Sequence, residues 1–259
     1  MVGRDVDTSY GRHFCERPGR IVLETRGLSA ANGTRNASIQ VREGEIVGLA
    51  GLVGSGRTEL ARAIFGADHR THGEIMLDGQ PLKDGPAHSV ARGMGLVPES
   101  RKSEGLAMIR SVHDNLLVAG LPRTFPNRTY RFRKAIRIVG DLIARLRIAT
   151  PTPQRLARFL SGGNQQKIVI GKWLNAGSRF FIFDEPTRGI DVGSKAEIFG
   201  LLDTIVAQGA AVLMISSELP EIVAVCDRAY VMRDCSIAGE LQRDALTEEN
   251  ILRLAMHHG

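Results

Sequence analysis

Short apolar runs alternate with longer amphipathic segments over most of the chain. Runs with the composition of strands cover 21–28, 36–41, 45–51, 73–79, 180–186 and 211–217. Helical periodicity covers 58–66, 111–147 and 197–208, and a further helix begins near Leu219. Apolar strands that alternate with amphipathic helices are typical of a mostly parallel sheet. The pattern therefore predicts an α/β fold, in which the early short strands form an antiparallel piece beside the parallel sheet.

The most basic part of the chain is also a predicted helix. Residues 123–147 carry much of the net charge of +6, and from Tyr130 onward their apolar residues fall on one stripe. The stripe consists of Ile136, Val139, Leu142, Ile143 and Leu146. A basic chain is compatible with a nucleic-acid or anionic membrane partner. No stacking motif surrounds the few aromatic residues here, so we interpret the charge as the solvated face of an amphipathic helix and expect no nucleic-acid partner.

Length and composition narrow the class of protein. A chain of 259 residues suffices for one α/β domain, or for a domain with a subdomain. Its three cysteines are too few and too scattered for a disulfide framework or a zinc site. No apolar run approaches the length of a spanning helix, and the first twenty residues have no apolar core like that of a signal peptide. We expect a soluble chain with only indirect membrane contacts.

A glycine-rich loop, GLVGSGRT, covers residues 51–58 directly after an apolar run. Its glycines let backbone amides turn toward an anion, and the positive end of the following helix points at the same place. The basic residue before the hydroxyl should reach the outer phosphates, and Thr58 should ligate magnesium. A glycine-rich turn without a ligand is the alternative. The predicted phosphate-binding residues are Gly51, Gly54, Ser55, Gly56, Arg57 and Thr58.

Two adjacent carboxylates end the apolar run FFIFDEP at 180–186. Neighbouring residues of a strand point to opposite sides, so Asp184 and Glu185 cannot have the same role. One carboxylate can hold a magnesium ion while the other polarises an attacking water. An acidic pair that merely faces solvent is the alternative, which the phosphate loop earlier in the chain makes the weaker interpretation.

A third motif, LSGGNQQK, covers residues 160–167 and precedes a helix that runs through Ile168 and Trp173. A hydroxyl and bare amides at a helix N-terminus form an anion site. One chain then has two phosphate-binding surfaces of different kinds. This suggests a nucleotide held between two copies.

The three motifs, in this order, resemble those of an ATP-binding cassette, the motor domain of ABC transporters, over residues 21 to about 257. The resemblance implies a P-loop NTPase core with an antiparallel β subdomain and a helical subdomain at about 100–165. In that family the signature of one cassette closes over ATP on the phosphate loop of another, so ATP and Mg²⁺ are the expected cofactors. The resemblance assigns catalysis to Glu185, the metal to Thr58 and Asp184, the signature to Leu160, Ser161, Gly162, Gly163, Asn164 and Gln165, and the dimer-seam loop to Gly189, Ile190 and Asp191.

Several positions depart from the family's pattern. Arg57 replaces the phosphate-loop lysine, and a planar guanidinium does not substitute for a compact ammonium at a tight site. Glu99 stands where the family has a glutamine, and a carboxylate near phosphates is electrostatically awkward unless it is protonated or metal-bound. Ser217 stands where the family has the switch histidine. The segment 29–36 supplies no aromatic ring to stack on adenine. We therefore expect this site to bind nucleotide poorly or to hydrolyse it slowly, while the signature face is intact.

This combination is similar to the second cassette of tandem ATP-binding proteins that drive uptake of ribose, galactose or xylose. The resemblance implies that residues 1–20 are a linker from a preceding cassette and that 21–259 form the nucleotide-binding domain. It also implies an ATPase subunit, weakly active alone, at the cytoplasmic face of the membrane. The expected partners are another cassette, transmembrane permease subunits and, indirectly, a periplasmic or extracellular sugar-binding protein.

Two other functions are compatible with these motifs. One is a non-transport ABC protein that acts on nucleic acid or ribosomes, for which the basic composition is the only argument. Such proteins usually have two cassettes with intact switch residues or long insertions, and this chain shows neither. The other is a regulatory module that binds nucleotide without hydrolysing it. The transported substrate cannot be inferred from these residues.

Overall fold

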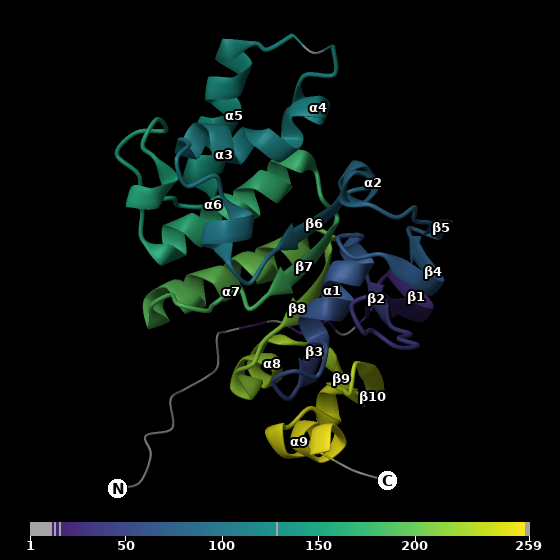
Figure 1. Ribbon diagram of the computed structural model, residues 1–259. Coiled ribbons are helices and arrows are strands. Elements are labelled where there is room, and N and C mark those ends of the chain that lie inside the picture. The colour runs from purple at the N-terminus through teal and green to yellow at the C-terminus, as the bar shows by residue number, and fades with distance from the viewer. Residues whose placement is uncertain (1–11, 13, 16, 128, 257–259) are drawn as a thin grey trace, which may run out of the picture.

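The computed structural model describes residues 12, 14–15, 17–127 and 129–256. A six-stranded sheet forms its centre, in the order β10-β9-β3-β8-β7-β6 (Figure 1). Strands β9, β3, β8, β7 and β6 run parallel, and β10 is antiparallel to β9. The six strands are β3 (Ile46–Gly51), β6 (Met94–Val97), β7 (Phe180–Asp184), β8 (Ala211–Ile215), β9 (Arg228–Arg233) and β10 (Ser236–Gln242). The predicted mostly parallel sheet is confirmed.

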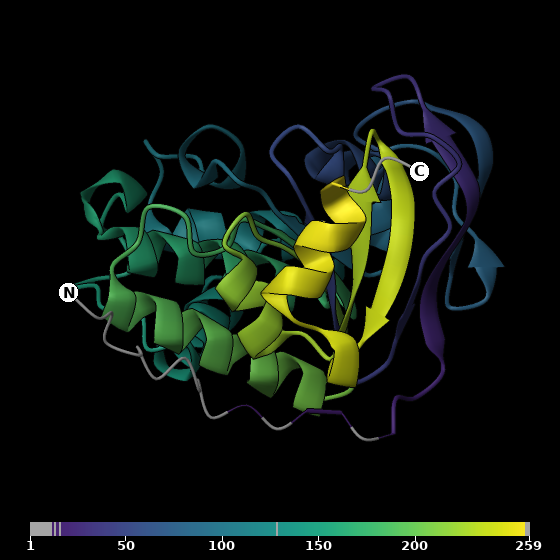
Figure 2. The same cartoon turned by 90° about the horizontal axis from the view of Figure 1, so that it is seen from below.

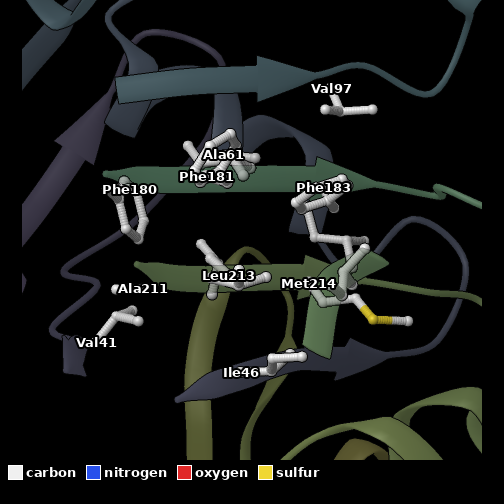
Figure 3. Close-up of a cluster of buried hydrophobic side chains, with 14 of the residues drawn as sticks. Val41, Ile46, Ala61, Val97, Phe180, Phe181, Phe183, Ala211, Leu213 and Met214 are labelled. Atoms are coloured by element: carbon white, nitrogen blue, oxygen red, sulfur yellow. The ribbon is translucent and has the colours of Figure 1, made fainter. Parts of the chain in front are cut away.

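The central strands are apolar because both faces of the sheet are covered. Every residue of β3, β7 and β8 is buried. Phe181 and Phe183 of β7 stack with ring centroids 6.1 Å apart, among side chains of β8 and β3 (Figure 3). Continuous apolar runs of this kind are expected for parallel strands between helices. The core thereby fixes the carboxyl ends of β3, β7 and β8, where the loops of the candidate site begin.

A second sheet, of four antiparallel strands, lies beside the first (Figure 1). Its order is β2-β1-β4-β5, with β1 (Ile21–Ala30), β2 (Gln40–Arg42), β4 (Arg70–Leu77) and β5 (Gln80–Pro81). The predicted antiparallel piece is therefore confirmed. The predicted strand at 36–41 is mostly wrong, because only its last two residues belong to β2 and Ala37 makes an isolated bridge to Leu28.

The segment between β6 and β7 is helical and lies at the top of Figure 1. It contains the π-helix η1 (Arg101–Gly105), α3 (Val112–Leu117), the 3₁₀ turn η2 (Val118–Gly120), α4 (Leu121–Thr124), α5 (Phe132–Arg145), the 3₁₀ turn η3 (Ala157–Phe159) and α6 (Gly162–Ala176). The continuous periodicity expected over 111–147 is interrupted, since α4 ends at Thr124 and α5 starts only at Phe132.

The stripe predicted for α5 is partly wrong. Val139, Leu142 and Leu146 are buried as expected, but Ile136 is 63% exposed and its neighbour Ala135 is buried instead. A helix buries positions three and four residues apart, and the series 135, 139, 142, 146 follows that spacing. Ile136 lies one residue, about 100°, away from this series and so faces outward.

The remaining helices pack against the sheets. They are α1 (Arg57–Phe65), α2 (Pro86–Ala91), α7 (Val192–Ala207), α8 (Leu219–Val225), the 3₁₀ turn η4 (Arg243–Ala245) and α9 (Glu248–Met256). The hairpin β9–β10 and helix α9 have no counterpart in the predicted elements. The hairpin turn uses Asp234 and Cys235 with φ values of 48° and 60°, so it lacks the glycine by which such turns are usually found in a sequence.

The described part of the expected linker runs along the edge of the molecule that lies at the bottom of Figure 2. Of residues 1–20, only 12, 14–15 and 17–20 are described, and the rest of that segment lies outside the described residues. The Asp227 carboxylate accepts hydrogen bonds from the Arg12 guanidinium at 2.5 Å and from the backbone N–H of Cys15 at 2.7 Å. Among the described residues, no helix is long and apolar enough to cross a membrane.

Candidate functional site

The phosphate loop connects the end of β3 to the start of α1. Gly51, Gly54 and Gly56 have φ values of 152°, 82° and 97°, of which the last two lie well inside the region that favours glycine. A side chain at Gly51 would also collide with the Met232 carbonyl oxygen, 2.5 Å from its Cβ. No side chain caps the N-terminus of α1, so its amides stay free to bind an anion. The backbone thus has a conformation that suits the predicted anion-binding loop, and binding of an anion there stays a prediction.

Thr58 and Asp184, predicted to share a metal ion, are brought together. Asp184 ends β7 with 3% of its surface exposed, close to the side chain of Thr58. Burial raises the pKa of Asp184 to about 6, the Thr58 side chain opposes this, and the nearby Glu185 carboxylate adds to it. Asp184 Oδ1 is buried without a hydrogen-bond partner in the described part of the chain. One carboxylate with a free oxygen and one hydroxyl fit Mg²⁺, which takes its other ligands from phosphates and water.

We expect Asp184→Asn to stabilise the chain by about 3 kcal/mol in EDTA at pH 7, because a pKa raised in the folded state means that the buried charge opposes folding. The gain should shrink as the pH falls from about 6 toward 4, where the wild-type carboxyl is itself protonated. Urea unfolding at several pH values measures this. A variant that is less stable than wild type at pH 7 would contradict the account of this site.

Glu185 follows the last residue of β7, and its backbone no longer continues the strand. Its φ is 49°, in the left-handed region, so its side chain separates from that of Asp184. The hydroxyl of Ser217 donates a hydrogen bond to Glu185 Oε2 at 3.1 Å. The residue at the switch-histidine position therefore contacts the predicted catalytic carboxylate.

The side chain of Arg57 does not extend freely into the phosphate loop, as a lysine at this position would. It is 8% exposed, and its Nη1 donates a hydrogen bond to the Ser216 carbonyl oxygen at 2.6 Å. Burial lowers the pKa of its guanidinium, while the carboxylates of Glu185 and Asp184 oppose that shift. Arg57 thus links the phosphate loop to the segment after β8.

Glu99 forms an ion pair with Arg188, which lies between Glu185 and the predicted seam loop. The sequence left it open how a carboxylate could be tolerated near phosphates, and a neutralising cation is the answer. Each of the three substituted positions, Arg57, Glu99 and Ser217, is therefore bonded to another loop of the same site.

The signature residues lie at the N-terminus of α6. Ser161 is the N-cap residue, makes no side-chain capping bond, and accepts a hydrogen bond from Asn164 Nδ2 at 2.9 Å. Gln165 Nε2 donates to the carbonyl oxygens of Ala157 and Leu160, both at 3.1 Å. The first-turn amides of α6 thus lack a side-chain cap, as a helix N-terminus that receives an anion requires.

Packing within the chain itself leaves little room for a side chain at either signature glycine. A Cβ at Gly162 would lie 2.7 Å from Nη2 of Arg101, and one at Gly163 would lie 2.4 Å from Oγ of Ser194. Ser194 belongs to the first turn of α7, where Asp191 of the seam loop accepts hydrogen bonds from its N–H and hydroxyl. The signature and the seam loop Gly189–Asp191 are therefore in contact.

No sequence motif indicates one buried carboxylate that lies close to this site. Glu221 is 3% exposed and accepts hydrogen bonds from the hydroxyls of Thr187 and Ser216 at 2.7–2.8 Å, and Lys195 Nζ lies 2.9 Å from it. It connects the segments after β7 and β8 with α7. Its partners are 5 to 34 residues away along the chain, so only the fold brings them together.

Comparisons with known proteins agree with this geometry. Residues 34–188 match the ABC transporter family. The chain is 47% identical over 257 residues to the Ribose import ATP-binding protein RbsA 1 of Rubrobacter xylanophilus, covering 98% of this chain and 51% of the relative. It is 46% identical over 263 residues to the Arabinose import ATP-binding protein AraG of Ralstonia nicotianae, covering 99% and 51%. The chain thus spans about half the length of these curated relatives.

A solved ATP-binding cassette of an ABC transporter, MJ1267, has the same fold. It superposes with a TM-score of 0.77 at 20% identity, over 92% of this chain and 100% of that one. The predicted P-loop NTPase fold with its added antiparallel sheet is confirmed. The family match covers more than half of the chain and includes the phosphate loop, the signature and both carboxylates. The chain therefore belongs to the ABC transporter family, as an ATP-binding cassette.

Proposed function

We propose that this chain is the ATP-binding half of an importer for a monosaccharide or a related polyol or nucleoside. It would couple ATP binding and hydrolysis between two cassettes to transport. Relatives of this chain are named as ribose and arabinose import ATP-binding proteins, and the chain corresponds to about half of each. The other half would be a second cassette, joined through residues 1–20 as a linker.

The difference between the two nucleotide-facing surfaces carries this proposal. At the phosphate loop, Arg57, Glu99 and Ser217 are bonded to other loops of the same chain. At the signature, the first-turn amides of α6 carry no side-chain cap and Ser161 is exposed. The chain would thus contribute a complete signature to ATP on the partner's phosphate loop, while its own site turns over slowly.

The chain's own phosphate loop would still hold MgATP. Thr58 and Asp184 would bind Mg²⁺, which supplies charge neutralisation for the phosphates when bound. Glu185 would orient water, with its carboxylate held by Ser217. Hydrolysis would be weak because the lysine, glutamine and histidine of a fast site are absent, and each lost contact to the transition state typically costs ~100-fold or more in rate.

The helical segment offers a surface for the membrane subunits. A groove of about 460 Å³ is lined by Val118, Leu121, Tyr130 and His113 among others, and Val118 is 55% exposed. The groove lies between Glu99 and the signature in the sequence, where the family receives its permease. Through this contact the chain would be held peripherally at the cytoplasmic face of the membrane, and a sugar-binding protein would act on it only indirectly.

Co-expression with the membrane subunits encoded beside the chain tests this function. The assembled complex should hydrolyse ATP at least ten times faster than the isolated chain. Val118→Glu should abolish co-purification because it places a charge in an apolar contact. Met256→Glu, at a residue 54% exposed on α9, is the matched control and should leave assembly intact. Assembly that survives Val118→Glu and fails with Met256→Glu would contradict the placement, and a complex no more active than the chain alone would contradict the function.

A further inference from the structure

Arg101 occupies a position to which the sequence assigned no role. It is the first residue of η1, two residues after Glu99, and its side chain donates hydrogen bonds to residues of other elements. Its Nη1 and Nη2 donate to the carbonyl oxygens of Arg188 and Gly189 at 2.8 and 2.9 Å, and its Nε donates to Gln165 Oε1 at 3.4 Å. One guanidinium thus joins the beginning of the seam loop to the signature helix.

The same guanidinium lies directly beside the signature turn. A Cβ at Gly162 would lie 2.7 Å from Arg101 Nη2, 3.1 Å from the Gly189 carbonyl oxygen and 3.2 Å from Cγ2 of Ile190. The signature, the seam loop and Arg101 therefore meet at a single point of contact. The ion pair of Glu99 with Arg188 ties the residue before η1 to the same loop.

The far end of η1 is attached to the signature helix as well. Lys172 is 9% exposed, and its Nζ donates to the Gly105 carbonyl oxygen at 2.7 Å. Both ends of η1 are therefore bonded to α6, and η1 directly precedes the segment that forms the groove described above. A displacement at the groove would move η1, α6 and the seam loop together.

We propose that Arg101 is a positioning residue that holds the seam loop and the signature in one fixed arrangement facing the partner's ATP. The proposal rests on the function proposed above and assigns this arrangement to one side chain. The planar guanidinium of Arg101 has N–H groups that point in different directions, so it can donate to three acceptors on two elements. A lysine would keep the charge but could not reproduce these directions.

Hydrogen exchange in the nucleotide-free full chain tests the structural part. Arg101→Ala should speed exchange at least tenfold in the amides of 188–193 and 161–165 and leave the phosphate loop 51–58 unchanged. Arg101→Lys should recover only part of the protection. Lys102→Ala, which removes an exposed cation from the same segment, is the matched control and should have no effect. Unchanged exchange in either segment, or equal loosening of the phosphate loop, would overturn the proposal.

Kinetics of the complex with the membrane subunits test the positioning role. Arg101→Lys should lower the maximal ATP turnover at least tenfold while the KM for ATP stays within twofold, since the partner's phosphate loop still binds the nucleotide. If hydrogen exchange shows that the signature and the seam loop are loosened while ATP turnover is unchanged, the positioning role is overturned. If the wild-type complex itself shows no ATP turnover, the proposed function fails, and the exchange result stands separately from that failure.

Discussion

Ser161→Glu should reduce ATP turnover of the assembled transporter by ~100-fold or more, the effect typical of losing a preorganised contact to the transition state. Ser161 is the exposed N-cap residue of α6, where the amides of the helix would meet the partner's γ-phosphate. A carboxylate there would repel the phosphate and could itself cap the helix, which would occupy the amides that the phosphate needs.

The control for this experiment must add the same charge elsewhere in the helical segment. Gln154→Glu does so at an exposed position seven residues before Ser161 and should leave turnover unchanged. Gly162→Glu is a poorer test, because its side chain would first collide with Arg101 inside the same chain. Turnover that is equal in the Ser161→Glu and Gln154→Glu complexes would show that the signature does not act on the partner's nucleotide.

The triple variant Arg57→Lys, Glu99→Gln, Ser217→His should raise the ATP turnover of the isolated chain by ~100-fold or more. The three changes restore groups that resemble those of an active cassette and remove the bonds to Ser216, Arg188 and Glu185. Since a working site needs a signature from a second copy, the rate should rise with the square of the chain concentration.

The restored variant should also be less stable than wild type. The Ser216 carbonyl loses a hydrogen bond from a buried charged donor, a loss of about 1.5–3 kcal/mol. Breaking the ion pair of Arg188, whose side chain is 66% exposed, should cost little stability.

Adding Glu185→Gln to the triple variant should abolish the gain in ATP turnover. A folded triple variant that binds MgATP without any gain would refute the view that these substitutions inactivate the site.

The sequence predicts the buried strands well because their residues are apolar throughout. The apolar runs predicted as strands are buried as β3, β7 and β8. The glycine loop begins at the last residue of β3, and the carboxylate pair begins at the last residue of β7. The β9–β10 hairpin was missed because its turn uses Asp234 and Cys235 instead of glycine. Ile136 was misplaced because a stripe read from residue types can shift by one position, which only packing determines.

The motifs predicted which residues lie at the site but not what the substituted residues touch. Arg57 looked like a weakened phosphate ligand, whereas in the fold it bonds to the carbonyl of Ser216, 159 positions later in the chain. Glu99 looked electrostatically awkward until Arg188 was placed beside it. Such contacts join residues that are far apart in the sequence, and a single sequence does not indicate which distant residues will meet in the fold.

The most direct test of the central claim compares Glu185→Gln with Ser161→Glu in the same reconstituted transporter, with ATP turnover as the readout. If the chain acts mainly through its signature, Glu185→Gln should keep at least half of the wild-type turnover and Ser161→Glu should lose nearly all of it. The account is contradicted if Glu185→Gln stops turnover while Ser161→Glu leaves it unchanged.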